Sequence, residues 1–119
     1  MNFIFDNDRP IYVQLVEQLQ IYIISGMILP GDRLPSVREL ALKLKVNPNT
    51  MQKALSELED LGLIYTERTN GKFVTTDKSK IEKLREKYAR EKTSKYINDI
   101  KELGLSKKDI INLIKEMEW

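Results

Sequence analysis

Apolar residues recur every three or four positions from Pro10 to Ser25, and Gly26 follows them. This spacing is typical of a helix with one buried face, and a glycine directly behind such a run commonly ends a helix. We therefore expect a core-supporting helix over residues 10–25. Residues 30–32, Pro-Gly-Asp, form a strong turn signal and separate this helix from the next periodic segment.

A shorter helix is expected soon after Leu34, with its own start signal. Ser36 is followed three positions later by Glu39. This is the pattern of a capping box, in which each side chain accepts a hydrogen bond from the free backbone N–H of the other residue. The pattern predicts a helix over about residues 37–45.

The next helix is expected from Pro48 to Leu61. Asn47 is a good N-cap residue, and Pro48 takes the first helical position, where a proline loses no helical hydrogen bond. Gly62 ends the helix. Its expected inward stripe is Met51, Ala54, Leu55, Leu58 and Leu61. Two capped helices joined by so short a turn form a helix-turn-helix, whose second helix can start in the major groove of DNA.

Two short strand candidates follow, at residues 63–66 and 72–75, on either side of the pair Asn70-Gly71. An Asn-Gly pair favours the tight turn of a β-hairpin. Three helices followed by a hairpin make a winged helix-turn-helix, and we assign residues 1–76 to this domain. The predicted fold is mainly α, with the hairpin as its wing.

Residues 77–119 are predicted to form a short α-helical hairpin. Glycine and proline are absent from residues 79–103, which suits one long helix, and Ser106 with Asp109 three positions on begins a last helix that runs to Trp119. Two helices alone cannot bury the apolar side chains that they carry, so either a second copy of the tail or the wing domain has to cover them. We expect this tail to form a dimer. The expected dimerisation residues are Ile81, Leu84, Tyr88, Tyr96, Ile100, Leu103, Ile110, Ile114 and Met117.

The first part of this tail is basic. Residues 78–95 hold eight Lys or Arg against three Glu. Such a run is either a second nucleic-acid surface or the solvated face of a helix with Glu-to-Lys pairs at spacing four, of which Glu91 and Lys95 are an example. The solvated face is the preferred interpretation.

Composition argues against enzymatic chemistry. The 119 residues include no histidine and no cysteine, which excludes disulfides and thiolate metal sites and removes the commonest general base. There is no glycine-rich phosphate loop and no supported pair of carboxylates. We expect no enzyme, no catalytic residues, no metal and no cofactor. With 41% hydrophobic and 32% charged residues, the chain should fold rather than stay disordered.

The same composition bears on location and on partners. No apolar run approaches the roughly 18–20 residues that span a bilayer, and the N-terminal sequence lacks a basic start and a small-residue cleavage site. We therefore expect a cytoplasmic protein without a membrane partner. The formal net charge is only +2, so a nucleic-acid partner has to be argued from where the charges lie.

The candidate DNA-binding residues lie at two helix starts and on the wing. Helix N-termini expose backbone N–H groups and partial positive charge, which suits phosphate contacts at the first helix of the motif and base contacts at the second. Asn and Gln can pair bidentately with adenine and Arg with guanine, each good pair contributing roughly 1–3 kcal/mol of discrimination. The candidates on the helices are Ser36, Arg38, Asn47, Pro48, Asn49, Thr50, Gln52 and Lys53. The candidates on the wing are Arg68, Thr69, Asn70, Gly71 and Lys72.

Each of these assignments has an alternative. Ser36 and Asn47 could be caps only, and both interpretations stay open because a cap can also touch phosphate. For Arg38, Gln52 and Lys53 a plain solvated surface is the weaker alternative. The whole chain could instead be a winged-helix module that binds another protein, but an Asn-rich helix start lacks the aromatic anchors that such docking would use.

With these motifs the sequence resembles the GntR family of bacterial transcription regulators. The matching segments are Pro10-Ile-Tyr-Val-Gln-Leu, Ile28-Leu-Pro-Gly-Asp-Arg-Leu-Pro-Ser-Val-Arg-Glu-Leu-Ala, Val46-Asn-Pro-Asn-Thr-Met and Leu58-Glu-Asp-Leu-Gly-Leu-Ile, together with Gly71. The resemblance implies a homodimer on a palindromic operator of double-stranded DNA. It also implies phosphate or base contacts from Ser36 and Arg38, base reading by residues 47–53, and a minor-groove contact at Gly71.

The short tail narrows the resemblance to the YtrA-like subfamily, whose tail is mainly a dimerisation device. We expect a repressor, and the resemblance further implies that it controls its own operon and a neighbouring transporter. Many family members carry Arg or Thr where this chain has Pro48 and Gln52, which leaves the operator sequence open. The sequence does not identify a small-molecule effector.

Overall fold

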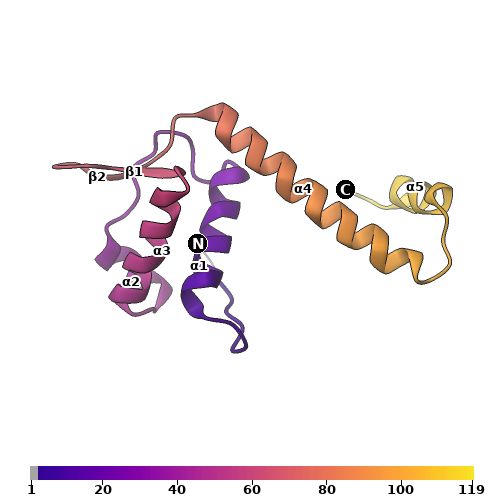
Figure 1. Cartoon of the computed structure of the whole chain (residues 1–119), viewed down its shortest axis with the longest axis horizontal. Helices are drawn as coiled ribbons and strands as arrows, with labels where there is room; N and C mark the ends of the chain where they lie inside the picture. Colours follow the sequence, from indigo (N-terminus) through magenta and orange to yellow (C-terminus); the bar gives the residue numbers. More distant parts are fainter. Residues whose placement is uncertain (1–2) are drawn as a thin grey trace. The chain divides into compact units, whose positions relative to one another are not determined.

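The computed structural model describes residues 3–119 and is mainly helical (Figure 1). Within these residues five helices and one antiparallel pair of strands follow in the order α1, α2, α3, β1, β2, α4, α5. The chain divides into two compact units, one that extends to Arg85 and one from Glu86 to Trp119. The predicted winged helix-turn-helix followed by tail helices is confirmed.

Helix α1, Ile11–Ile24, packs its apolar face into the first unit and also buries a polar side chain. Gln14 is only 2% exposed. Its amide nitrogen donates to the carbonyl oxygens of Asp6 (2.8 Å) and Arg9 (2.9 Å), and its oxygen accepts from the Asp6 N–H (2.7 Å). One buried amide therefore fastens the N-terminal segment to the helix.

Helix α2, Val37–Leu44, begins where the capping pattern predicted it. The Ser36 hydroxyl accepts a hydrogen bond from the Glu39 N–H at 3.1 Å. The return bond, from the Ser36 N–H to the Glu39 carboxylate, does not form among the described residues, so the expected capping box is only half made. Helix α2 ends at Lys45, which has a positive φ of 56° and takes the left-handed conformation common at helix ends.

Helix α3, Pro48–Asp60, carries four of the five residues of its expected inward stripe into the core. Met51, Ala54, Leu55 and Leu58 are fully buried. Leu61 is 48% exposed, which corrects its assignment to the stripe. It is the C-cap of α3 and directly precedes Gly62, where the chain turns with φ of 75°.

The wing consists of β1, Ile64–Glu67, and β2, Gly71–Val74. The strands are antiparallel, and their register pairs Ile64 with Val74 and Glu67 with Gly71. A third segment lies along the free edge of β2: the Leu34 N–H donates to the Lys72 carbonyl (2.8 Å), and Arg33 pairs with Phe73 in an isolated bridge. The segment before α2 is thus hydrogen-bonded to the wing.

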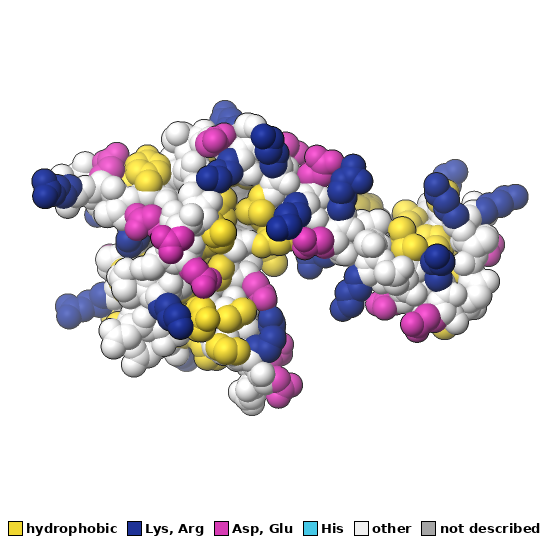
Figure 2. Space-filling view, in the orientation of Figure 1, with side chains coloured by type: hydrophobic (Ala, Val, Ile, Leu, Met, Phe, Trp, Pro, Cys, Tyr) yellow, Lys and Arg dark blue, Asp and Glu magenta, His cyan; other side chains and the backbone are white. Residues whose placement is uncertain are grey.

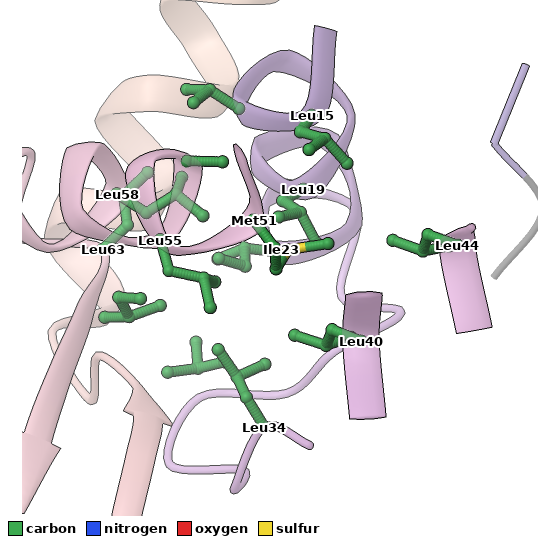
Figure 3. Packing of buried hydrophobic residues seen from close by; sticks show 14 of the residues in the cluster. Leu15, Leu19, Ile23, Leu34, Leu40, Leu44, Met51, Leu55, Leu58 and Leu63 are labelled. Carbon is green, nitrogen blue, oxygen red and sulfur yellow. The ribbon is translucent and has the colours of Figure 1, made fainter. Parts of the chain in front are cut away.

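One hydrophobic core joins these elements. Figure 3 shows labelled side chains from α1 and α3 turned towards a common interior, with Leu34 and Leu40 closing it. The buried members are Leu15, Val16, Leu19, Ile23, Leu34, Leu40, Ala41, Leu44, Met51, Ala54, Leu55, Leu58, Leu63, Ile64, Val74 and Ile81. Helix α3 contacts α1, α2 and β1, so the core fixes its orientation within the first unit.

Helix α4, Lys78–Lys101, begins in this first unit. Ile81 is 4% exposed and belongs to the core, and Leu84 packs against it. The sequence predicts both residues in a dimer interface. Ile81 is already buried within the single chain, which corrects the prediction for Ile81. Arg85 holds the end of α1, because its Nε and Nη2 donate to the Ile24 carbonyl oxygen at 2.9 and 2.6 Å.

Helix α5, Lys107–Glu116, stops before the predicted end at Trp119. Its start carries the complete capping box that α2 lacks: the Ser106 hydroxyl accepts from the Asp109 N–H, and the Asp109 carboxylate accepts from the Ser106 N–H at 2.9 Å. The hydrogen bond from the Ser106 backbone N–H and, after it, the interaction with the Ser106 side chain hold the pKa of the Asp109 carboxyl below its ordinary value.

The second unit contains an apolar groove of about 550 Å³ between α5 and the end of α4. Its lining includes Tyr96, Ile97, Ile110, Ile111 and Ile114. Other apolar side chains nearby in the sequence are exposed, among them Leu103 and Met117. Over residues 3–119 no helix is long and apolar enough to cross a membrane.

Candidate nucleic-acid interface

The start of α2 offers an exposed hydroxyl and an exposed guanidinium. Ser36 acts as the N-cap, and its oxygen is engaged by the Glu39 N–H. Arg38, on the first turn, is exposed. The remaining free N–H groups of the first turn carry the partial positive charge of the helix end. This end can therefore receive a phosphate.

The start of α3 is polar and free of acidic side chains in its first turn. The Asn47 Oδ1 accepts a hydrogen bond from the Asn49 N–H at 2.8 Å, which fixes the Asn47 side chain as the cap. Pro48 has no N–H to satisfy. Asn47, Pro48 and Asn49 are exposed, and Thr50 is half-buried. The cap uses only the oxygen of Asn47, so its amide N–H₂ group keeps its donors.

One turn further along α3, two longer side chains follow different paths. The Gln52 amide nitrogen donates to the Ser56 hydroxyl at 3.2 Å, so the side chain lies along the helix. The Lys53 ammonium sits over the ring of Tyr12, 3.7 Å from its centre, in a cation–π contact between α3 and α1. Tyr12 was not a predicted site residue, since no local pattern indicates this contact.

The wing tip presents several exposed polar side chains. Arg68, Thr69 and Asn70 are exposed, and the Asn70 amide donates to the Glu67 carboxylate at 3.0 Å. Gly71 has φ of 101°, a backbone conformation that a side chain would strain. The tip is therefore a tight turn whose backbone can approach another molecule closely.

Lys72 is less free than the other wing candidates. Its ammonium donates to the Thr66 hydroxyl at 2.9 Å and lies 4.0 Å from a Glu59 carboxylate oxygen, with 18% of its side chain exposed. The Thr66 hydroxyl donates in turn to Glu59 at 2.5 Å. These contacts tie the wing to the last part of α3.

The candidates come from three neighbouring elements of the first unit. Figure 1 shows α3 between α2 and α1, and the end of α3 leads into the β-hairpin of the wing. Acidic and basic side chains are interspersed on the face seen in Figure 2. Residues 1–76 hold eight Lys or Arg against nine Asp or Glu. Placement of a few donors, rather than bulk charge, must therefore provide any binding.

A capped helix-turn-helix followed by a β-wing defines a winged-helix DNA-binding domain. Residues 11–74 match the family described as bacterial regulatory proteins, gntR family. The chain belongs to the GntR family and is a DNA-binding transcriptional regulator, not an enzyme.

Two relatives from Bacillus subtilis illustrate the match. The uncharacterized HTH-type transcriptional regulator YhcF is 40% identical over 111 residues, which cover 93% of this chain and 92% of YhcF. The HTH-type transcriptional repressor YtrA is 45% identical over 69 residues, which cover 58% of this chain and 53% of YtrA. The first of these alignments includes the tail.

Two solved structures extend the comparison. A GntR family transcriptional regulator from Listeria monocytogenes has a TM-score of 0.87 and 45% identity, and the alignment covers 96% of this chain and 100% of that one. The DNA-binding domain of AraR in complex with operator ORX1 has a TM-score of 0.56 and 31% identity, covering 60% of this chain and 93% of that one.

Proposed function

We propose that the protein is a repressor that binds a palindromic operator as a homodimer. The observation that carries the proposal is the start of α3, where the Asn47 cap and a first turn without acidic residues leave Asn47 and Asn49 exposed. Polar amides at a helix start suit reading of base edges in the major groove. A relative of this chain, the DNA-binding domain of AraR, was solved on its operator, and the relative YtrA is a repressor.

Within this proposal the contacts divide by chemistry. Arg38 and the free N–H groups of α2 would bind phosphate or a guanine edge. The α3 candidates Asn49 and Gln52 would read bases, with adenine as the preferred partner of an amide. The wing tip around Gly71 would approach the minor groove, where a glycine allows the backbone to come close.

The homodimer is supported by the second unit. Its apolar groove and its exposed Ile114 and Met117 side chains are more apolar surface than a short helical pair keeps in water without a partner. A two-fold dimer buries the same patch on both copies. It would also present two α3 helices to two half-sites, so the operator would be palindromic.

Target genes follow from the resemblance alone. A regulator with so short a tail is proposed to act on its own operon and on a neighbouring transporter.

Selection of bound fragments from random DNA by the full-length protein tests the proposed binding to a palindromic operator directly. We expect an inverted repeat that also occurs in the promoter of its own gene. Recovery of no preferred sequence would contradict the proposal and favour a protein-binding module.

A substitution at Arg38 tests the proposed site. Replacing Arg38 with Ala should weaken binding to the selected operator by about 5- to 150-fold, because a charged contact of roughly 1–3 kcal/mol is lost. Fluorescence anisotropy with labelled DNA measures the change. Lys83→Ala, which removes an exposed cation from α4, is the control and should bind as the unaltered protein does. Equal affinities for the two variants would remove Arg38 from the site.

A further inference from the structure

Arg33 is an exposed arginine within the matching segment of residues 28–41 that is not among the predicted site residues, and it lies against the wing glycine. A Cβ built on Gly71 would be 3.4 Å from the Nε and 3.6 Å from the Nη2 of Arg33. The Arg33 guanidinium therefore lies within van der Waals range of the position where a side chain at residue 71 would begin. The backbone of the wing turn and this cation form one surface.

Strand pairing explains how Arg33 reaches this position. Arg33 forms an antiparallel bridge with Phe73, flanked by hydrogen bonds from the Leu34 N–H to the Lys72 carbonyl and from the Val74 N–H to the Asp32 carbonyl. Side chains two residues apart on a strand share a face. A side chain that starts opposite Phe73 can therefore extend along that face to Gly71, towards the wing tip.

The charge of Arg33 is available. No hydrogen bond or ion pair joins its side chain to another residue in the described part of the chain, residues 3–119. The two nearby acids are occupied: Asp32 accepts from the Leu29 N–H at 2.9 Å, and Glu67 accepts from the Asn70 amide. Lys72, by contrast, is held by Thr66 and Glu59. Arg33 is thus a free cation beside Gly71, unlike Lys72.

We propose that Arg33 is an additional DNA contact of the wing and binds a backbone phosphodiester beside the groove that the wing enters. The inference rests on the proposed DNA-binding face. A guanidinium can donate two parallel hydrogen bonds to a phosphate, and half or more of protein–DNA hydrogen bonds go to phosphate and sugar, so the DNA backbone is favoured over base edges. The contact is accordingly independent of base sequence.

The salt dependence of binding tests this assignment. The logarithm of the binding constant falls with the logarithm of salt concentration by about 0.9 for each phosphate contacted. For Arg33→Gln we expect this slope to decrease by about one for each bound subunit, on the selected operator and on unrelated DNA alike. Lys83→Gln removes the same charge from α4 and is the matched control, with an unchanged slope. Arg33→Lys keeps the charge and should keep the slope.

The outcomes are separable. If the unaltered protein binds DNA without a steep salt dependence, the proposed function itself fails. If it binds steeply but Arg33→Gln has the slope of the control, or Arg33→Lys loses as much slope as Arg33→Gln, then Arg33 is only a brace for the wing and the inference is overturned. Thermal melts of each variant report folding separately from the slope.

Discussion

At the scale of single residues, the contacts that organise the first unit join positions far apart in the sequence. Lys53 meets Tyr12, and Arg33 meets Gly71. Lys53 was predicted as a site residue from its place in the motif, but its aromatic partner was not predictable, because neither position carries a local signal for the other. The same holds for Arg33, whose neighbour depends on the register of the wing.

Gln14 gives a residue-scale prediction. Replacing Gln14 with Leu should lower the free energy of unfolding by about 1–3 kcal/mol, because three backbone groups in the N-terminal segment lose a buried partner. Thermal or urea unfolding of the full chain measures the change. Gln18→Leu is the matched control, since Gln18 makes a single exposed bond to the Ile4 carbonyl, and it should change stability by less than about 0.5 kcal/mol. Equal effects of the two substitutions would mean that the buried hydrogen bonds of Gln14 add no more to the free energy of unfolding than the exposed bond of Gln18 does.

At the scale of elements, the sequence predicted helix starts better than helix faces. Ser36, Asn47 and Ser106 cap the three helices that they were expected to cap, because a cap is decided by a few consecutive residues. Which face of a helix is buried depends on the elements that pack against it. Ile81 fits a helical stripe in the tail, yet its partner proved to be the core of the first unit, and no periodicity distinguishes those two destinations.

The capping box of α5 makes a prediction about pH at this scale. The lowered pKa of Asp109 means that its carboxylate stabilises the helix start fully above the ordinary carboxyl pKa, and that this stabilisation is lost as pH falls through the lowered value. Amide NMR signals of residues 106–110 should report increased fraying on acidification. Asp109→Asn should fray at neutral pH already, whereas Asp99→Asn, which removes an exposed carboxylate from α4, should behave as the unaltered chain. A pH-independent helix start would contradict the prediction.

At the scale of the whole molecule, affinity for an operator should depend on the second unit even though the proposed DNA contacts lie in the first. Two weakly binding first units gain affinity when their chains are joined in a dimer, because the second one binds at high effective concentration.

The predicted domain boundary after residue 76 remains a prediction. The compact units divide after Arg85, so the first turns of α4 belong to the first unit.

The dimer prediction is tested on the full chain. Ile114→Glu places a charge in the apolar groove and should convert dimers to monomers in light scattering, because an unpaired buried charge is costly. Asn112→Glu adds the same charge at an exposed position of α5 outside the groove and should leave the mass unchanged. A dimer that persists in Ile114→Glu would place the interface elsewhere. Operator affinity should fall together with the dimer.

The segment along the outer edge of β2 also protects the protein against self-association. A two-stranded hairpin has two open edges, and an open edge can recruit strands from other molecules. Residues 31–34 hydrogen-bond to β2 through the Gly31 and Leu34 N–H groups, so within residues 3–119 the free edge of this sheet belongs to the four-residue β1. The wing can thus project for binding while offering little template for intermolecular sheet growth.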